Sequence, residues 1–389
     1  RDQRLSRGLG DVYKRQAAKK PVIYSGGGTI QADASKELTE FSKLIGCPVT
    51  NTLMGLGAFP GNDNQFVGML GMHGTYEANM VMSEADLIFN VGARFDDRIT
   101  NNPSKFGLAA KKIHIDSDPS SIDKIIGVDL AIEGDAKLVM QQLIEQVKAC
   151  GFDQTIYKDW WSKVEDWRKA HGLNHDMLNL KNEKDIILPQ QVIQSLYQTT
   201  KGDAYVTSDV GQHQMFAAQY YKFKDPRKWI NSGGLGTMGF GLPSAMGVKF
   251  AFPEADVACV TGEGSIQMCI QELSTCGQYG LPIKIVNLNN RALGMVKQWQ
   301  DMQYGGRYSS ISYEDSLPDF VKLAESFGHI GIKVEKLSEL NDAMKESFAM
   351  KDKLVFLDVL VDPDEHVYPM LEAGGSMSEM RLSKDKKTF

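Results

Sequence analysis

The sequence lacks long apolar runs, paired cysteines and an excess of basic residues, and each absence excludes a class of protein. No apolar run reaches the roughly 18 residues that a membrane-spanning helix needs, so we expect no membrane segment. The five cysteines include no CxxC pair, which is typical of reduced cytoplasmic thiols rather than of disulfides or a zinc site. The formal net charge of −6 provides no basic surface for nucleic acid. We therefore expect a cytoplasmic globular protein without nucleic-acid or membrane partners.

Apolar runs and helical patterns alternate in two parts of the 389-residue chain. This alternation predicts an α/β protein with two doubly wound parallel-sheet domains. The first sixteen residues hold five basic and two acidic side chains and no apolar core, so we interpret them as a leader not native to the fold. The predicted parts are a leader (1–16), a first domain (17–150), a linker (151–187), a second domain (188–361) and a tail (362–389). Trp160 or Trp161, with Trp167, is expected to pack between the domains.

A phosphate and metal site is predicted where the turn 262–265, Gly-Glu-Gly-Ser, joins an apolar strand (256–261) to a helical stretch (266–278). Glycine lets backbone N–H groups approach a phosphate, and a helix N-terminus favours its charge. Glu263 and Asn290 follow successive predicted strands and offer the hard oxygen ligands that Mg²⁺ prefers. Such a turn also occurs by chance in α/β proteins, and asparagines can simply cap a strand end.

The predicted strand ends of the first domain also carry conspicuous turn residues, among them Gly26–Gly28, Gly71–Gly74 and Gly92–Asp96. Ligands of doubly wound sheets bind beyond the carboxyl ends of the strands. We therefore expect these loops to line one crevice. The alternative is that they are ordinary short connections, in which glycine is common.

Four further segments are Thr207–Phe216, Asn231–Pro243, Gly294–Gln300 and Glu365–Met370. Together with the turn at Gly262 they resemble the catalytic large subunit of acetolactate synthase (acetohydroxyacid synthase), from about Ala17 to the C-terminus. The resemblance implies a transferase that uses thiamine diphosphate, Mg²⁺ and FAD. It implies the condensation of pyruvate with pyruvate or 2-ketobutyrate, with release of CO₂, to 2-acetolactate or 2-aceto-2-hydroxybutyrate. This is the first common step of branched-chain amino acid (isoleucine and valine) biosynthesis. It also implies a homodimer or tetramer of catalytic subunits and a small regulatory subunit.

The resemblance assigns residues to each cofactor. Met238 would support the bent thiamine diphosphate, Glu263, Asn290 and the Ala292 carbonyl would bind Mg²⁺, and FAD would be structural without net redox chemistry. The thiamine diphosphate positions are Gly211, Gln212, His213, Gly236, Met238, Gly262, Gly264, Ser265 and Met295. The FAD positions are Gly26, Gly27, Gly28, Thr52, Leu53, Met54, Gly71, Met72, His73, Gly92, Arg94, Asp96, Arg98, Asp116, Asp135 and Ala136. The family has Asp where this chain has Glu263, whose extra methylene extends the carboxylate by about 1.5 Å.

Met72, Asp97, Met295 and Trp299 match the pocket for the second keto acid in this family. Met295 and Trp299 are four residues apart and share a helix face, although a buried apolar stripe would have the same spacing. In the family, the glutamate that activates the cofactor lies in an N-terminal pyrimidine-binding domain, which the predicted domains do not include. We therefore expect the chain as given to be inactive alone. Two alternatives are another thiamine-diphosphate carboligase or oxidase, and an inactive cofactor-binding fragment.

Overall fold

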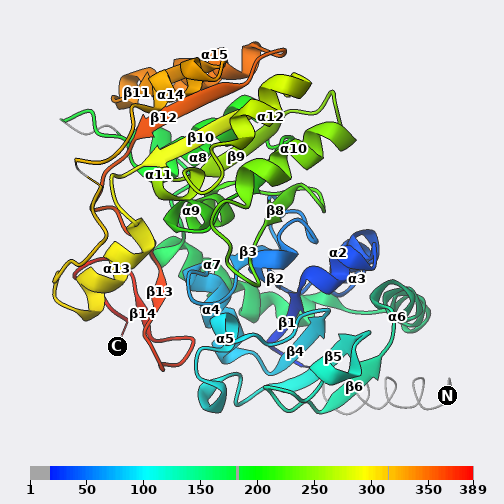
Figure 1. The fold of residues 1–389 in the computed structure, drawn as a ribbon. Helices are drawn as coiled ribbons and strands as arrows, with labels where there is room; N and C mark the ends of the chain where they lie inside the picture. The colour runs from blue at the N-terminus through cyan, green and yellow to red at the C-terminus, as the bar shows by residue number, and fades with distance from the viewer. Residues whose placement is uncertain (1–17, 181–183, 314, 389) are drawn as a thin grey trace. The chain divides into compact units, whose positions relative to one another are not determined.

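The computed structural model describes residues 18–180, 184–313 and 315–388, and the leader predicted at 1–16 lies outside these residues (Figure 1). The chain divides into two compact units. The first unit is Arg1–Leu173 with Pro369–Phe389, and the second unit is Asn174–Tyr368. No helix among the described residues is long and apolar enough to cross a membrane.

The first unit contains a six-stranded parallel sheet in the order β3-β2-β1-β4-β5-β6. Its strands are β1 (Pro21–Ser25), β2 (Val49–Asn51), β3 (Phe66–Met69), β4 (Leu87–Val91), β5 (Lys111–Asp116) and β6 (Leu130–Glu133). Its longer helices are α3 (Ser35–Ile45), α4 (Tyr76–Glu84), α6 (Ala136–Cys150) and α7 (Lys158–His171). Its shorter elements are α2 (Gly27–Gln31), η1 (Leu53–Gly55), α5 (Asp97–Thr100), η2 (Pro103–Lys105), η3 (Pro119–Ser121), η4 (Gln154–Tyr157) and the antiparallel pair β13 (Met370–Leu371) and β14 (Met380–Arg381).

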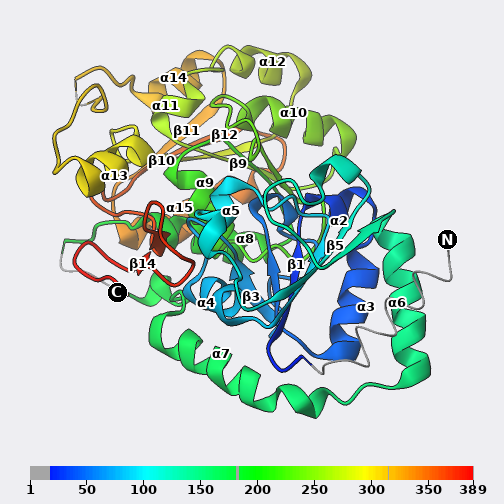
Figure 2. The same cartoon turned by 90° about the horizontal axis from the view of Figure 1, so that it is seen from below.

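Every residue of the central strand β1 is buried, because helices cover both faces of this sheet. Helices α3 and α6 lie side by side at one side of the sheet, and α4 contacts α7 (Figure 2). Leu38, Phe41 and Ile45 are buried at helical spacing on α3, which ends at Gly46 in a left-handed conformation. The short helix α2 (Gly27–Gln31) precedes α3 as a separate element.

The tryptophans of the predicted linker pack differently from the prediction. Trp160 and Trp167 are buried in the core of the first unit, on α7. The Trp160 indole donates to the Pro21 carbonyl at 3.0 Å, and the Trp161 indole donates to the Gly46 carbonyl at 2.7 Å. The prediction that these side chains pack between domains is therefore wrong, because all three pack in or against the core of the first unit and the Trp160 and Trp161 indoles find their partners there. The tail is also divided, since residues from Pro369 onward belong to the first unit.

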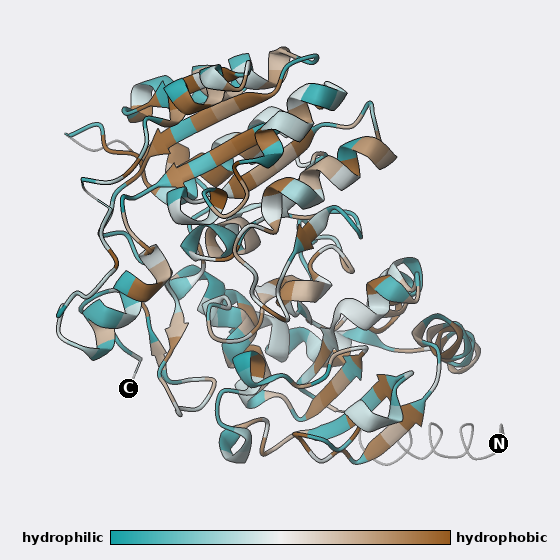
Figure 3. Ribbon diagram, viewed as in Figure 1, coloured by the Kyte–Doolittle hydropathy of each residue, from teal (hydrophilic) through white to brown (hydrophobic). Residues whose placement is uncertain are grey.

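The second unit contains another six-stranded parallel sheet, in the order β11-β12-β10-β9-β7-β8, whose strands are strongly hydrophobic (Figure 3). The strands are β7 (Tyr205–Ser208), β8 (Trp229–Asn231), β9 (Val257–Thr261), β10 (Lys284–Asn289), β11 (Ile330–Val334) and β12 (Val355–Leu360). The helices are η5 (Met177–Asn179), α8 (Pro189–Thr200), α9 (Gln212–Tyr220), α10 (Gly241–Ala251), α11 (Glu263–Ile266), α12 (Glu272–Tyr279), α13 (Gly294–Gln303), α14 (Phe320–Ser326) and α15 (Leu337–Ala349). The predicted class, an α/β protein with two doubly wound parallel sheets, is confirmed.

The single helix predicted over 266–278 is two helices, α11 and α12, joined by tight turns. The Gln267 side-chain amide donates to the Glu263 carbonyl at 2.8 Å. That carbonyl is the acceptor that a continuing helix would offer to the backbone N–H of Gln267. The chain then proceeds through three-residue turns, such as Cys269 N–H to the Ile266 carbonyl at 3.1 Å.

Candidate cofactor site

The second unit has a topological switch point between β7 and β9. From β7 the chain passes to β8 on one side of the sheet, and β9 and β10 follow on the other side. Ligands of doubly wound sheets bind in the crevice at such a reversal, outside the carboxyl ends of the strands. The predicted turn at Gly211 follows β7, the turn at Gly262 follows β9, and Asn290 follows β10. The fold therefore places three predicted cofactor segments at neighbouring strand ends.

The His213 ring fills the space between the first two of these ends. A Cβ atom on Gly211 would lie 2.7 Å from the ring, and one on Gly262 would lie 2.8 Å from it, so a side chain at either position would require the ring to shift. Burial lowers the pKa of His213 to about 4, which keeps the imidazole neutral near pH 7. Its buried Nε2 atom has no hydrogen-bond partner among the described residues. A buried imidazole nitrogen without a partner indicates room for a polar group of a ligand or a water at this place.

Glu263 and Asn290 come together as predicted. Glu263 Oε1 and Asn290 Oδ1 accept hydrogen bonds from the same backbone N–H, that of Ala292, at 2.6 and 3.1 Å. Glu263 is only 1 % exposed, and burial raises the pKa of its carboxyl from 4.5 to about 7. Two oxygens that share one donor leave their other lone pairs for a cation, and Mg²⁺ prefers such ligands. Among the described residues no three His, Cys, Asp or Glu side chains cluster, so a cation here would need backbone, amide or cofactor oxygens as well.

Three predicted positions differ in detail from the expected arrangement. Ala292 faces both oxygens through its N–H, so coordination of a metal by its carbonyl stays a prediction. The Ser265 hydroxyl donates to the Val210 carbonyl at 3.2 Å, and the Ser265 N–H donates to the Gly262 carbonyl at 3.0 Å. Both Ser265 donors are therefore used within the protein. A Cβ atom on Gly264 would lie 2.7 Å from the Tyr313 hydroxyl, so this tyrosine covers the turn.

Asp209 is a residue of this site that the sequence reasoning missed. It is fully buried at the end of β7 and accepts from the Gly241 N–H at 2.8 Å and from the Thr261 hydroxyl at 2.6 Å. It thus ties β7 to β9 and to the start of α10, just after the loop that contains Gly236 and Met238. Gly236 is exposed and Met238 is half-buried. The available signal was an acidic residue directly after an apolar strand.

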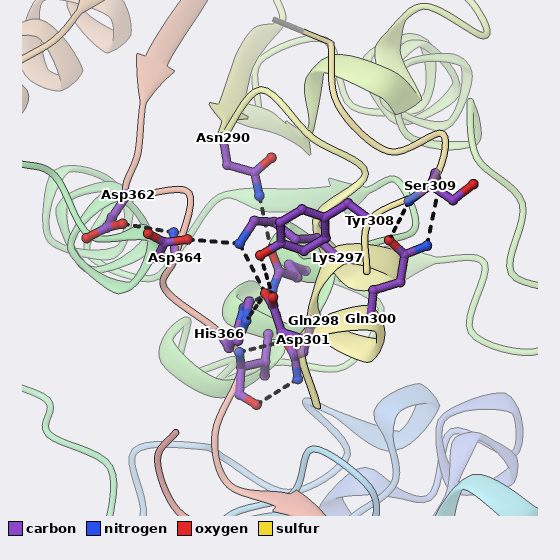
Figure 4. Close-up of polar contacts among 12 residues, drawn as sticks. Asn290, Lys297, Gln298, Gln300, Asp301, Tyr308, Ser309, Asp362, Asp364 and His366 are labelled. Carbon is purple, nitrogen blue, oxygen red and sulfur yellow. Dashed lines mark hydrogen bonds and ion pairs between the residues drawn. The ribbon is translucent and has the colours of Figure 1, made fainter. Parts of the chain in front are cut away.

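Helix α13 carries Met295 and Trp299 on the same turn spacing, as predicted. The buried residues of this helix are Lys297 and Gln298, whereas Met295 and Trp299 are half-buried and Val296 is 45 % exposed. Lys297 lies between two carboxylates, 3.1 Å from Asp301 and 2.8 Å from Asp364 (Figure 4). The buried side of α13 is thus its polar side. The alternative interpretation of Met295 and Trp299 as a buried apolar stripe is therefore wrong.

In the first unit the strand order reverses between β1 and β4. This order, 3-2-1-4-5-6, is the order of dinucleotide-binding sheets, which hold their ligand at that reversal. The predicted FAD residues all follow carboxyl ends of strands or, for Asp116, end one. Six strands about 4.8 Å apart span roughly 24 Å, a width that suits an extended ligand. The crevice predicted from the loops therefore has a common sheet edge.

The glycines at this reversal pack against one another. A Cβ atom on Gly26 would lie 2.3 Å from the Gly92 carbonyl oxygen, and the Gly28 N–H donates to the same oxygen at 3.0 Å. These glycines therefore allow the chain at the end of β1 to pack directly against the chain at the end of β4. The nearby buried Asn51, at the end of β2, has no hydrogen-bond partner for either side-chain amide atom among the described residues. The sequence reasoning missed Asn51, which a ligand or water at the strand end would satisfy.

The charged FAD candidates are mostly exposed and paired. Arg94 donates to Asp96 at 3.1 Å, and Arg98 is exposed. Asp135 caps α6 by accepting from the Leu138 N–H at 3.0 Å.

The remaining predicted positions lie in the loops at the carboxyl ends of the strands, as predicted. Thr52, Leu53 and Met54 follow β2; Gly71, Met72 and the buried His73 follow β3; Gly27 begins α2; Asp116 ends β5; and Ala136 begins α6. Of the four substrate-pocket candidates, Met72 and Asp97 lie in the first unit and Met295 and Trp299 in the second.

Comparison with known families supports both units. Residues 16–143 match the family model of the thiamine pyrophosphate enzyme central domain, and residues 209–359 match that of the C-terminal TPP binding domain. The chain belongs to the thiamine pyrophosphate enzymes.

Within this class its relatives are acetolactate synthases. It is 57 % identical over 373 residues to the acetolactate synthase large subunit of Buchnera aphidicola subsp. Schizaphis graminum, covering 94 % of this chain and 63 % of the relative. It is 57 % identical over 376 residues to the acetolactate synthase isozyme 3 large subunit of Escherichia coli K12, covering 96 % and 64 %. It is 41 % identical over 372 residues to acetolactate synthase of Mycobacterium bovis, covering 95 % and 60 %. The predicted resemblance is confirmed, and the chain spans somewhat less than two thirds of the length of these relatives.

Proposed function

We propose that the protein containing this chain is an acetolactate synthase. It condenses pyruvate with pyruvate or 2-ketobutyrate to 2-acetolactate or 2-aceto-2-hydroxybutyrate, with release of CO₂, in branched-chain amino acid biosynthesis. The observation that carries this proposal is the convergence of Glu263, Asn290 and the buried His213 at three neighbouring strand ends. The names of relatives at 57 % identity select this activity among those of thiamine pyrophosphate enzymes.

Thiamine diphosphate and Mg²⁺ fit the residues at the switch point of the second unit. Glu263 and Asn290 would hold the cation, with the Ala292 carbonyl as a further ligand. The Nε2 of His213, which has no partner among the described residues, would bind a diphosphate oxygen once it carries a proton. When bound, thiamine diphosphate supplies the carbanion chemistry that keto-acid decarboxylation requires. The residues of this chain bind it, orient it and, through Met238, support its shape.

FAD fits the reversal of the first sheet, between β1 and β4, as a structural cofactor without net redox chemistry. The strand order supports a dinucleotide at this place. The unpartnered amide of Asn51 supports a polar group beyond the strand ends. Because Gly26 and Gly92 are in close contact, the ligand would lie across these ends and not between them.

The second keto acid would contact Met72, Asp97, Met295 and Trp299. The half-exposed apolar side of α13 supports this assignment, since Met295 and Trp299 are not needed to fill the core beneath the helix. An apolar pocket that holds one additional methyl group can discriminate 2-ketobutyrate from pyruvate by about 1–3 kcal/mol. We further propose a homodimer or tetramer of catalytic subunits, joined by a small regulatory subunit, and a cytoplasmic location.

The test measures cofactor binding and turnover separately. Residues 17–389 are joined to the pyrimidine-binding domain of a relative and supplied with pyruvate, thiamine diphosphate, Mg²⁺ and FAD. We expect retained FAD fluorescence and 2-acetolactate, detected as acetoin after acid treatment. Glu263→Gln should abolish product formation while FAD stays bound, because the two sites belong to different units. Product formation independent of thiamine diphosphate, or another product from pyruvate, would refute the proposal.

A further inference from the structure

Two buried side-chain amides, those of Gln298 and Gln212, connect the backbone of Val367 to the half-buried amide of Asn290. Val367 N–H donates to Gln298 Oε1 at 2.9 Å, and Gln298 Nε2 donates to the Val367 carbonyl at 3.2 Å. Gln212 Nε2 donates to the same Gln298 oxygen at 2.9 Å. Asn290 Nδ2 then donates to Gln212 Oε1 at 3.1 Å. Gln298 and Asn290 mark the ends of this amide row in Figure 4.

The direction of every hydrogen bond in the amide row follows from its first member. A side-chain amide can turn over and exchange its oxygen and nitrogen, but a backbone N–H cannot become an acceptor. Val367 therefore requires an oxygen from Gln298 at this position. That oxygen requires the NH₂ group of Gln212, whose oxygen is left for Asn290. Asn290 must then present its NH₂ group to Gln212, and its Oδ1 faces the Ala292 N–H beside Glu263.

A second contact fixes Gln212 in the same direction. Gln212 Nε2 lies 3.4 Å from His366 Nδ1, and His366 Nε2 lies 2.8 Å from Asp301 Oδ2. Asp301 is an acceptor that also receives Lys297 at 3.1 Å and the Tyr308 hydroxyl. The His366 proton therefore belongs on Nε2, and Nδ1 accepts from Gln212. Burial lowers the pKa of His366, which agrees with a neutral ring.

We propose that Gln298 is a positioning residue for the divalent-cation site: through Gln212 it forces the oxygen of Asn290, and not its NH₂ group, toward the cation. This inference rests on the metal site of the proposed function. Gln298 itself contacts neither Glu263 nor Ala292 through any hydrogen bond described above. Its effect would be exerted through hydrogen-bond direction, along side chains that are 0 % exposed for Gln298 and 6 % exposed for Gln212. Outer partners that orient a metal ligand commonly change metal affinity by about 10–100-fold.

Helix α13 offers a matched control. Gln300 holds the backbone of Ser309 in the same two-sided way, with Ser309 N–H donating to Gln300 Oε1 at 3.1 Å and Gln300 Nε2 donating to the Ser309 carbonyl at 3.3 Å (Figure 4). No hydrogen bond described above connects Gln300 to Gln212 or Asn290. Gln298→Met and Gln300→Met therefore both remove an amide that holds backbone, but only the first removes the start of the amide row.

The experiment measures Mn²⁺ binding by electron paramagnetic resonance and Mg²⁺ binding by calorimetry, each on the purified protein with saturating thiamine diphosphate. We expect Gln298→Met to weaken both cations about tenfold or more, and Gln300→Met to leave them unchanged. Gln298→Glu keeps an acceptor toward Val367 N–H and Gln212, so it should retain cation affinity even though it loses the donor to the Val367 carbonyl. Equal weakening by Gln298→Glu and Gln298→Met would show that Gln298 is merely structural.

A double substitution tests the hydrogen-bond direction itself. Asn290→Asp keeps one oxygen toward the cation and replaces the NH₂ group that faces Gln212 with a second oxygen. That second oxygen lies against Gln212 Oε1 as long as Gln298 holds Gln212 in its present direction. Gln298→Met removes the stronger of the two contacts that hold Gln212 in this direction, so when it is combined with Asn290→Asp it should raise cation affinity or leave it unchanged. An equal loss of affinity from Gln298→Met with and without Asn290→Asp would overturn the inference. A parent protein that binds neither cation would instead refute the metal site of the proposed function, and the inference with it.

Discussion

Replacing Glu263 with Gln should stabilise the metal-free protein at neutral and alkaline pH while removing its cation site. Burial raises the pKa of the Glu263 carboxyl from 4.5 to about 7 in the folded chain. The folded state therefore holds a proton that the unfolded state releases between these two values. Because stability rises with pH only where the unfolded state binds more protons, this group lowers the free energy of unfolding as pH rises from about 4.5 to about 7.

The magnitude follows from the size of the shift. Each pKa unit corresponds to about 1.36 kcal/mol, so the loss approaches about 3 kcal/mol above pH 7. Gln cannot ionise, and its amide oxygen can still accept from the Ala292 N–H that Glu263 Oε1 meets at 2.6 Å. Glu263→Gln should therefore be free of this loss, and its advantage over the parent should grow by about 2–3 kcal/mol between about pH 5 and about pH 8.

Urea unfolding of both proteins without divalent cations, at these two pH values, measures the difference. Glu254→Gln is the control, because Glu254 is an exposed carboxylate of the same unit and should leave the pH dependence of the parent unchanged. A calorimetric titration with Mg²⁺ and thiamine diphosphate should show that Glu263→Gln has lost the cation. Parallel pH profiles for the parent and Glu263→Gln would refute the reasoning, because they would mean that the Glu263 carboxyl ionises as easily in the folded chain as in the unfolded one.

Two shorter predictions concern the cation site, and a third concerns the proposed pocket for the second keto acid. Gly294→Ala should destabilise the protein by about 1–3 kcal/mol and weaken Mg²⁺ binding, because the added Cβ atom would lie 2.1 Å from Gln212 Oε1. Thermal melting and cation titration measure these two effects, and undiminished Mg²⁺ affinity would contradict the prediction. Glu263→Asp should draw the carboxylate back by about 1.5 Å from the Ala292 N–H and so tighten Mg²⁺ binding, whereas unchanged or weaker binding would show that the site is adapted to Glu. Trp299→Leu should leave pyruvate decarboxylation mostly intact and shift products from 2-aceto-2-hydroxybutyrate toward 2-acetolactate by about 1–3 kcal/mol of lost discrimination; an unaltered product ratio with both keto acids present would remove Trp299 from the pocket.

The strand-based part of the site was predictable because parallel strands have one direction. Once the apolar runs before Gly262 and Asn290 were read as buried parallel strands, their carboxyl ends had to share one edge of the sheet. The structure accordingly brings Glu263 and Asn290 to one N–H group. The same reasoning placed the glycines of the first unit at one sheet edge.

The sequence could not show contacts that depend on side-chain direction. Helical spacing placed Met295 and Trp299 on one face of α13, but only packing decided that Lys297 and Gln298 face inward. The break after Ile266 depends on the Gln267 amide reaching a backbone carbonyl, which no periodicity reveals. Likewise, Asp209 and Asn51 carry short polar side chains in or beside apolar strands, and their burial is visible only in three dimensions.

The ring of His213 and the glycines at positions 211 and 262 have an evolutionary consequence. Because both residues are glycines without a side chain, the space between the two strand ends holds one imidazole ring. A change at either glycine requires the ring to shift or a smaller residue to stand at position 213, and a smaller residue there leaves a void that a larger neighbour can fill. We therefore expect changes at the three positions to be coupled, so that a lineage that changes one of them acquires a compensating change at another.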